Sequence, residues 1–288
     1  TLAPASIVRA GEINLEAFST YAATSLTSAY VASLKTETDA FAVHMGAIAT
    51  RLGLVGDARF LLQPGLEIRS TGDLTLVNDW NLSSWRFDGA PAVVSLRAAG
   101  NLTLNATLSD GFDGVLPTSA LRSDRSASLR LVGGADLAAA DPLAVLGGGA
   151  GRTDGDVALA VNKLVRTGTG DIELAAARHF DLGAGATGVN RRTAALYTAG
   201  RATSTDDYPQ LAGFTPPSGT GVSASYPTGG GDVRIQAGGD VLGGITHQLV
   251  TEWQQRRGRT SEAGTLLSSQ NPSWWINFGN FQQNVGAL

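Results

Sequence analysis

The carboxylates of this sequence that stand close enough to suggest acid–base chemistry form three groups. These are Asp206 with Asp207, Asp110 with Asp113, and Asp156 with Asp171. Hydrolysis or elimination on a sugar chain needs carboxyl groups that converge on one bound substrate. Aspartate beside glycine more commonly serves turns, by accepting hydrogen bonds from nearby backbone amides. We therefore expect structural roles for these acids and assign no catalytic residue.

The sequence also contains no motif typical of a metal site or of a catalytic nucleophile. The histidines, His44, His179 and His247, are far apart, and the sequence contains no cysteine and no GxSxG turn. Residues 147–159 and 229–235 each match a calcium-binding nonapeptide once, but never in tandem. We expect no metal and no cofactor, with weak calcium binding as the open alternative.

Composition excludes further classes of function. The net charge is −4, the pI is about 5.4 and only 16% of residues are charged. Such a chain has no basic field to attract nucleic acid or anionic lipid. It has no apolar run of the roughly 18 residues that a membrane-spanning helix needs. The 37 glycines fit many turns between short strands.

The stretch GGGDVRIQAGGDVLGG, residues 229–244, belongs to an internal repeat. Its phrase of glycine, acid or amide, and alternating aliphatics recurs at residues 11–15, 72–76, 100–104, 155–159 and 170–174. A phosphate-binding glycine loop would need a helix directly after it, whereas the alternation here indicates a strand. We therefore interpret the phrase as the structural unit of a stacked, all-β chain.

Alternation within each unit predicts which side chains face the core, because neighbouring strand residues point to opposite faces. We expect one elongated core that contains Leu74, Leu76, Leu102, Leu104, Val157, Leu159, Ile172, Leu174, Val233 and Ile235. We expect the opposite orientation for Thr75, Thr103, Ala158, Glu173 and Arg234. Stacking of such units in parallel is typical of a β-solenoid.

Three segments depart from the repeat. Helical spacing predicts an amphipathic helix over residues 34–52, with Phe41, Met45 and Ile48 on its buried stripe. A segment rich in Ser, Thr, Pro and Gly predicts a long surface loop over 203–228. We divide the chain into residues 1–60 (one rung and the helix), 61–244 (the repeats) and 245–288 (a helical and aromatic extension that continues the solenoid).

Two groups of aromatic residues have different expected roles. Trp80, Trp85 and Phe87 follow a repeat strand, and we expect them in the core because large aromatics bury much area. The second group lies near the end of the chain and is a candidate ligand or interface surface: Trp274, Trp275, Phe278 and Phe281. If exposed, it would mark a contact or sugar-binding face, and if buried it would be packing.

Several longer phrases resemble the filamentous haemagglutinin family of large bacterial exoproteins. They are LLQPGLEIRSTGDLTLVNDWNLSSWRF (61–87), LRAAGNLTLNATLSDGF (96–112) and YPTGGGDVRIQAGGDV (226–241). The resemblance implies a right-handed parallel β-helix and two-partner secretion, through an outer-membrane barrel transporter of a Gram-negative bacterium. It also implies an adhesin at the cell surface, of which we expect this chain to be a central fragment.

Two hypotheses for function follow. The first is a structural and adhesive segment that contacts a host or bacterial receptor or glycan, with possible end-to-end self-association and no nucleic-acid partner. The second is a β-helix enzyme or carbohydrate-binding module that acts on surface polysaccharides. A cluster of carboxylates in one solvent-facing groove would favour the second hypothesis. The sequence shows no such cluster, so we expect a protein that is not an enzyme.

Overall fold

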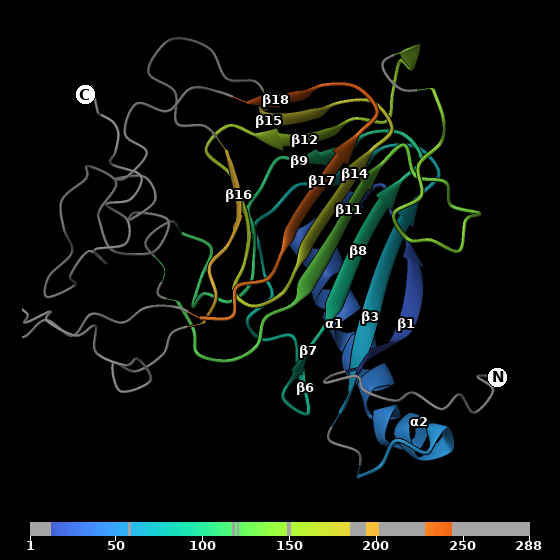
Figure 1. Ribbon diagram of the computed structural model, residues 1–288, viewed down its shortest axis with the longest axis vertical. Coiled ribbons are helices and arrows are strands. Elements are labelled where there is room, and N and C mark those ends of the chain that lie inside the picture. Colours follow the sequence, from blue (N-terminus) through green and yellow to red (C-terminus); the bar gives the residue numbers. More distant parts are fainter. Residues whose placement is uncertain are drawn as a thin grey trace, which may run out of the picture.

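The computed structural model is mostly β. It describes residues 13–56, 59–116, 119, 121–148, 151–184, 194–201 and 228–243. These residues contain eighteen strands and two helices, and neither of these helices has the length and apolar character needed to cross a membrane. Sixteen strands form three sheets in which all neighbours are parallel (Figure 1). The other two form an antiparallel hairpin, β6 (Arg86–Phe87) and β7 (Ala90–Pro91).

Each sheet collects strands from successive parts of the chain. The first sheet has the order β1 (Ile13–Ala22), β3 (Phe60–Ser70), β8 (Val93–Ala98), β11 (Ser128–Gly133), β14 (Ile172–Ala176) and β17 (Val233–Ala237). The second has β2 (Ser25–Leu26), β4 (Leu74–Leu76), β9 (Leu102–Leu104), β12 (Val157–Ala160), β15 (Phe180–Ala184) and β18 (Val241–Gly243). The third has β5 (Trp80–Asn81), β10 (Leu108–Ser109), β13 (Leu164–Thr167) and β16 (Ala195–Thr198).

The chain passes through the first, second and third sheets in that order, and each complete coil adds one strand to each sheet. Four complete coils run β3–β4–β5, β8–β9–β10, β11–β12–β13 and β14–β15–β16. Short alternating strands cannot bury their own apolar faces, so stacking against the next coil is what makes them stable. Long parallel sheets of this kind are consistent with the β-solenoid-like class that the repeats predict.

The core runs along the stack as columns of register partners. Leu74, Leu102 and Val157 form one such column, and Leu76, Leu104 and Leu159 form the next. All six are fully buried, as are Ile172 and Leu174 in the first sheet. The predicted outward residues are partly or fully exposed: Thr75, Thr103, Ala158, Glu173 and Arg234. The predicted facing is therefore confirmed for these strands.

Val233 and Ile235 differ from the other predicted core residues. Their register partners are Ile172 and Leu174, so they lie on the inward face as predicted. They are nevertheless 42% and 40% exposed. The reason is their position on β17, the last strand of the first sheet among the described residues, where they have a neighbouring strand on one side only.

The acid or amide of the repeat joins one coil to the next at the corner before the second sheet. Asp73 Oδ1 accepts a hydrogen bond from the backbone N–H of Asn101, at 2.7 Å. Asn101 Oδ1 accepts from two amides of the next coil, at 3.0 Å each, and Asp156 Oδ1 accepts from the amide of His179, at 3.0 Å. His179 Nδ1 accepts from the amide of Asp240, at 2.8 Å. We call Asp73, Asn101, Asp156 and His179 the corner ladder.

The irregular spacing of the repeat has a simple structural cause. The copies at residues 72–76, 100–104 and 155–159 begin strands of the second sheet, whereas those at 170–174 and 231–235 begin strands of the first sheet. The phrase thus marks two different corners of each coil. At the corner before the first sheet, Asp171 Oδ1 accepts from the amide of Asp232, at 2.8 Å. Close stacking there also requires glycine, because a Cβ at Gly231 would collide with the backbone of Gly170.

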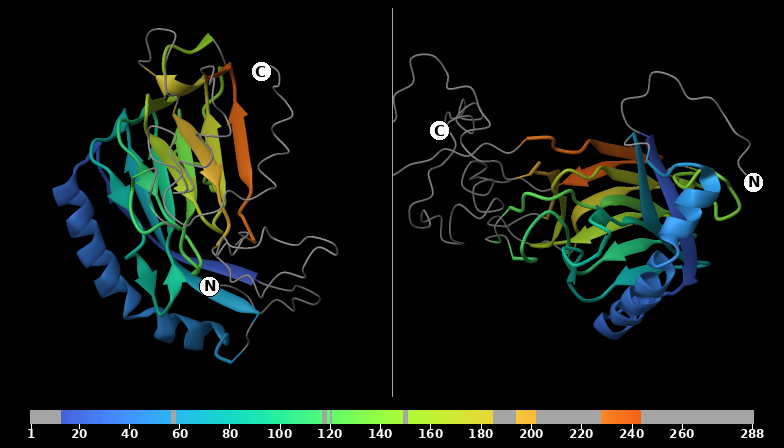
Figure 2. Two further views of the ribbon diagram at one scale, coloured as in Figure 1. Left: turned by 90° about the vertical axis from the view of Figure 1, so that its left-hand side faces the viewer. Right: turned by 90° about the horizontal axis from the view of Figure 1, so that it is seen from below.

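Two helices stand where one was predicted over 34–52. Helix α1 (Ser28–Ala42) begins earlier, because the Thr27 side chain accepts from the Tyr30 amide and caps it, and α2 (Met45–Leu52) follows after a break. They follow β2 and lie at the end of the stack that holds β1 and β3 (Figure 2). Met45 is buried as predicted, but Phe41 and Ile48 are only half-buried. The most buried side chains of α1 are Leu34 and Thr38.

Two predicted segments lie wholly or almost wholly outside the described residues. Of the loop predicted over 203–228, the structure describes only Thr228, which pairs with Arg201 in an antiparallel bridge. The amide of each residue donates to the carbonyl of the other, at 3.0 and 3.3 Å. The extension predicted over 245–288 is outside the described residues.

Candidate functional site

The structure gives Asp110 a structural role. Its side chain is fully buried, and both its oxygens accept from the Arg86 guanidinium at 3.0 Å. It also accepts from the backbone amides of Gly111, at 2.7 Å, and Ala127, at 2.6 Å. Asp113, its partner in the sequence grouping, is exposed and forms an ion pair with Arg122 at 3.4 Å. These two acids do not converge on a common substrate position.

The other acid groups are not brought together as catalytic pairs. Asp156 belongs to the corner ladder and pairs with Arg178 at 3.0 Å, while Asp171 lies at the corner before the first sheet. Asp206 and Asp207 lie outside the described residues. The repeated corner positions therefore explain Asp156 and Asp171 without any catalytic role.

The histidines do not form a metal centre within the part of the chain that is described. His44 is exposed at the start of α2, and His179 belongs to the corner ladder. His247 lies outside the described residues. Across the described ranges, no three His, Asp or Glu side chains gather closely enough to hold a metal ion.

The first aromatic group is core, as predicted. Trp80, Trp85 and Phe87 are buried, and the rings of the two tryptophans meet edge to face with centroids 5.3 Å apart. Lys35 of α1 lies over the rings of Trp85 and Phe87, at 5.9 and 5.4 Å. The second group, Trp274, Trp275, Phe278 and Phe281, is outside the described residues, so its role stays a prediction.

The outer face of the first sheet carries a groove of about 450 Å³ that combines charged, polar and aromatic side chains. We call it the outer groove. Four strands form its floor, and the segment after β11 forms one wall. Its lining includes Glu16 and Phe18 of β1, Gly65, Glu67 and Arg69 of β3, Ser95 and Arg97 of β8, Arg130 of β11, and Ala139, Ala140 and Pro142 of the wall.

Backbone geometry explains how these residues meet. Glu67 and Ser95 are register partners, as are Arg69 and Arg97, so parallel pairing places them side by side. Gly65 is the register partner of Phe18, and a Cβ at Gly65 would come within 2.6 Å of the Phe18 Cβ. The missing side chain at Gly65 therefore lets β1 approach closely and leaves the floor hollow.

Ion pairs organise the charged side chains of the outer groove. Glu67 pairs with Arg69 and, at 3.4 Å, with the buried Arg97. Arg130 donates to both oxygens of Glu16 at 2.7 Å and reaches Glu173 at 3.3 Å. The hydrogen bonds to Glu16 raise the pKa of Arg130, although burial opposes this, so the guanidinium stays charged.

A backbone contact also holds the wall of the groove. Arg97 donates from Nη2 to the Asp136 carbonyl, at 2.6 Å, which ties the segment after β11 to the sheet. Arg97 Nε is buried and has no hydrogen-bond partner among the described residues. The wall is therefore held by a side chain that is itself only 1% exposed.

Sequence reasoning did not find the outer groove. The alternation of Glu67 and Arg69 within β3 was a usable signal, since polar residues at alternate positions indicate an outward face. The close approach of β1 to β3 at Gly65 and the position of residues 139–142 along the sheet are tertiary features. Those two features turn a flat outer face into a groove.

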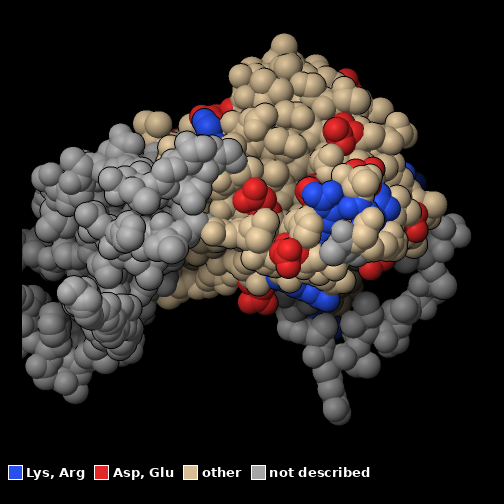
Figure 3. Space-filling view, turned by 90° about the horizontal axis from the view of Figure 1, so that it is seen from above, with Lys and Arg blue, Asp and Glu red and all other residues tan. Residues whose placement is uncertain are grey.

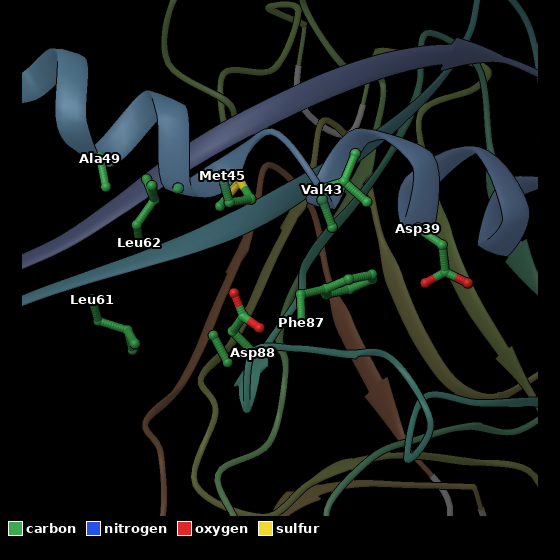
Figure 4. A pocket seen from close by; sticks show the side chains of 11 residues that line it. Asp39, Val43, Met45, Ala49, Leu61, Leu62, Phe87 and Asp88 are labelled. Atoms are coloured by element: carbon green, nitrogen blue, oxygen red, sulfur yellow. The ribbon is translucent and has the colours of Figure 1, made fainter.

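A second cavity of about 490 Å³ lies between the helices and the stack (Figure 4). Apolar side chains make up most of its walls, among them Met45 and Ala49 of α2 and Leu61 and Leu62 of β3. Figure 4 shows the carboxylates of Asp39 and Asp88 on separate elements, and Asp39 is already paired with Lys35 at 2.5 Å. This cavity is a packing gap between the helices and the strands, and its lining does not bring polar groups together at one point.

Charges of both signs lie side by side on the face seen in Figure 3. The basic side chains visible there are bordered by acidic ones, and no broad patch of one sign spans this face. Comparison of the chain with protein-family models, with curated proteins and with solved structures finds no match.

Proposed function

We propose that the chain is a structural and adhesive segment of a large secreted bacterial surface exoprotein of the filamentous haemagglutinin type. In this proposal the stacked coils are a right-handed parallel β-helix, which provides length and rigidity. The outer face and the loops make contacts, and no substrate is turned over. Secretion through an outer-membrane barrel transporter and a location at the cell surface follow from the family resemblance of the repeat phrases.

The use of the repeated residues carries this proposal. At the repeated corner, side-chain oxygens accept hydrogen bonds from backbone amides of neighbouring coils, as seen for Asp73, Asn101 and Asp156. The aliphatic residues beside them fill the core. A repeat whose polar and apolar residues both serve stacking builds a rod in which each coil contacts mainly its neighbours. A catalytic site would need further convergent groups that stacking does not use.

End-to-end association is part of the proposal. Exposed apolar side chains mark the last strands of the described stack: Val233, Ile235, Val241 and Leu242. At the other end of the stack, Leu34 of α1 packs into the main core. An apolar strand edge is a template for pairing with a second copy of the chain. An apparent molar mass from light scattering that rises with protein concentration would support this association. A mass that stays at that of the monomer would contradict it.

One observation favours a second candidate, a carbohydrate-active enzyme or carbohydrate-binding module. The outer groove contains two carboxylates, Glu16 and Glu67, on a solvent-facing surface. Glycoside hydrolysis requires two carboxyl groups placed on either side of the bond to be broken. Here each carboxylate is already engaged in ion pairs with arginine, and we therefore rank catalysis on a carbohydrate in this groove second.

Two measurements on the purified chain test the proposed function. Beads coated with the chain should adhere to bacterial or epithelial cells more strongly than beads coated with the heat-denatured chain. The same chain, incubated with acidic and neutral polysaccharides, should release no new reducing ends. Equal adhesion by native and denatured chain would refute the adhesive role. Cleavage that Glu67→Gln and Glu16→Gln abolish would establish the enzyme instead.

A further inference from the structure

The outer groove has the rigid floor that a specific binding site requires. Most of its polar residues come from β3, β8 and β11, three adjacent strands inside the first sheet, and Glu16 comes from the edge strand β1. Side chains held on paired strands keep their positions better than side chains on loops. Ion pairs and the Arg97 contact to the Asp136 carbonyl hold the floor and the wall together.

Polar atoms that stacking does not use converge in this groove. Ser95 is 5% exposed and lines the groove, yet its hydroxyl makes no hydrogen bond within the described part of the chain. Beside it, Glu67 uses only Oε1 in its bonds to Arg69 and Arg97, which leaves Oε2 as an acceptor. Arg69 uses only Nε in the same set of bonds. The groove thus offers a free hydroxyl, a free acceptor and free donors.

These free donors and acceptors of the groove are complementary to a ligand that carries hydroxyl groups on adjacent atoms. Each hydroxyl both donates and accepts, so a pair of them is satisfied by a carboxylate oxygen next to guanidinium nitrogens. A phosphate or carboxylate ligand has acceptors only and would meet Glu67 and Glu16 as repelling neighbours. The free atoms of the groove therefore favour a polyhydroxylated ligand.

Phe18 supplies an apolar surface at the same place. Its side chain lines the groove and is 60% exposed on the outer face of β1. An exposed aromatic ring is less stable in water than a ring packed against apolar atoms. A ring in a polar groove is therefore suited to a ligand with one apolar face. A pyranose ring has such a face, formed by its C–H groups, with hydroxyls around its edge.

The charges of the groove also select against a polyanion. Three arginines line the groove, Arg69, Arg97 and Arg130. They pair with three glutamates, of which Glu16 and Glu67 line the groove and Glu173 lies next to it beside Arg130. Paired charges in equal number create little net field to attract sulfated or uronate polymers. A neutral sugar needs no such field.

We propose that the outer groove binds a neutral pyranose unit of a surface glycan. The ring stacks on Phe18, and its hydroxyls pair with Ser95 Oγ, Glu67 Oε2 and the terminal nitrogens of Arg69. This inference deepens the proposed adhesive function, on which it rests for the source of the glycan, by naming the class of molecule contacted.

The test titrates the purified chain with oligosaccharides at 25 °C. Neutral hexasaccharides of glucose, mannose, galactose, xylose and N-acetylglucosamine form the panel, and a heparin hexasaccharide is the charged comparison. We expect saturable binding of at least one neutral member, unchanged between 0.05 and about 0.5 M NaCl, where charge-driven binding is screened. Phe18→Ala should weaken this binding about tenfold, and Ser95→Ala about fivefold.

Matched variants separate binding from folding. Leu116→Ala removes an exposed apolar side chain that does not line the outer groove and should bind as the unmodified chain does. The free energy of unfolding is measured for each variant, and Phe18→Ala should leave it nearly unchanged because the ring is exposed. Absence of binding by the whole neutral panel overturns the proposal. Salt-sensitive binding of heparin alone, or binding that both groove variants leave intact, overturns it as well.

Failure of this test and failure of the proposed function are distinguishable. A chain that binds no sugar but still holds coated beads to cells keeps its adhesive role and uses another surface. A chain that binds a neutral sugar but holds no beads has a saccharide site without adhesive strength. Either result is read directly from the two assays.

Discussion

Asn101 accepts two backbone hydrogen bonds from the next coil, both at 3.0 Å, from the amides of Gly155 and Asp156. The backbone N–H of Asn101 in turn donates to Asp73 Oδ1 of the preceding coil, at 2.7 Å. Asn101 therefore joins three coils, through its backbone N–H on one side and its side-chain oxygen on the other, which explains why an acid or amide stands after glycine at this corner.

Replacement of Asn101 by alanine should destabilise the stack. Asn101→Ala leaves two partly buried amides without their acceptor, and we expect a loss of about 1–3 kcal/mol in the free energy of unfolding. Asn14→Ala is the control, because Asn14 is exposed on β1 and makes no side-chain hydrogen bond to the described residues. Urea denaturation measures both variants. Equal losses would argue against the corner ladder.

Core and outward positions of the same strand should respond differently to truncation. Leu104 is 1% exposed, whereas its neighbour Thr103 faces outward. Leu104→Ala should cost about 2–5 kcal/mol, because it removes buried contacts and leaves a cavity. Thr103→Ala should cost less than about 1 kcal/mol. Chemical denaturation that gives similar losses for the two variants would contradict the facing of β9.

A buried arginine holds the loop after β10. The Arg166 guanidinium lies 3.8 Å from the centre of the Phe112 ring and donates to the carbonyls of Gly114, at 2.9 Å, and Leu116, at 2.8 Å. Lysine keeps the charge but lacks the planar fork of donors. Arg166→Lys should therefore lower the free energy of unfolding by about 2–4 kcal/mol.

Amide exchange locates this effect. Arg166→Lys should speed exchange most strongly at residues 111–116, since local opening of a loop follows the loss of its anchor. Arg234→Lys changes an exposed arginine and serves as the control. Exchange in Arg166→Lys that matches this control throughout the loop would show that Arg166 does not anchor it.

Asp181 should make stability depend on pH. Burial, and then repulsion by Asp156, raise the pKa of Asp181 above its usual 3.8. An acid whose pKa is raised by folding stabilises the protein below its unfolded pKa, and this stability is lost as pH rises through the folded pKa. At neutral pH the ionised carboxylate is therefore unfavourable, and Asp181→Asn should stabilise the protein. We expect a gain of about 0.5 kcal/mol or less, because solvent screens the charge.

The pH series checks the sign of this effect. The advantage of Asp181→Asn at pH 7 should disappear near pH 3, where the carboxyl group of the unmodified chain also carries its proton. Glu37→Gln, an exposed change on α1, should show no comparable gain. An advantage that persists at pH 3, or a variant that is less stable at pH 7, would refute the explanation.

Local patterns were enough to predict the repeat strands and their facing, and one buried residue of the helical region, Met45. Alternation placed Leu74, Leu102 and Val157 in one column, because a strand that buries one face must repeat every second residue. Helical spacing found Met45, but it missed the start of α1, where Thr27 caps the helix through a side chain outside the apolar stripe. Trp80 and Trp85 were correctly placed in the core from size alone.

Sequence alone thus determined the repeat, the inward residues and the turn-forming acids, because each of these depends on neighbours within a few positions. Only the tertiary structure decided that the repeated phrase serves two different corners, since this depends on how many residues each coil contains. It also decided the outer groove, in which Glu16 and Arg130 meet although 114 positions separate them. That contact exists because stacked coils bring distant strands onto one face, and no local pattern records which coil lies beside which.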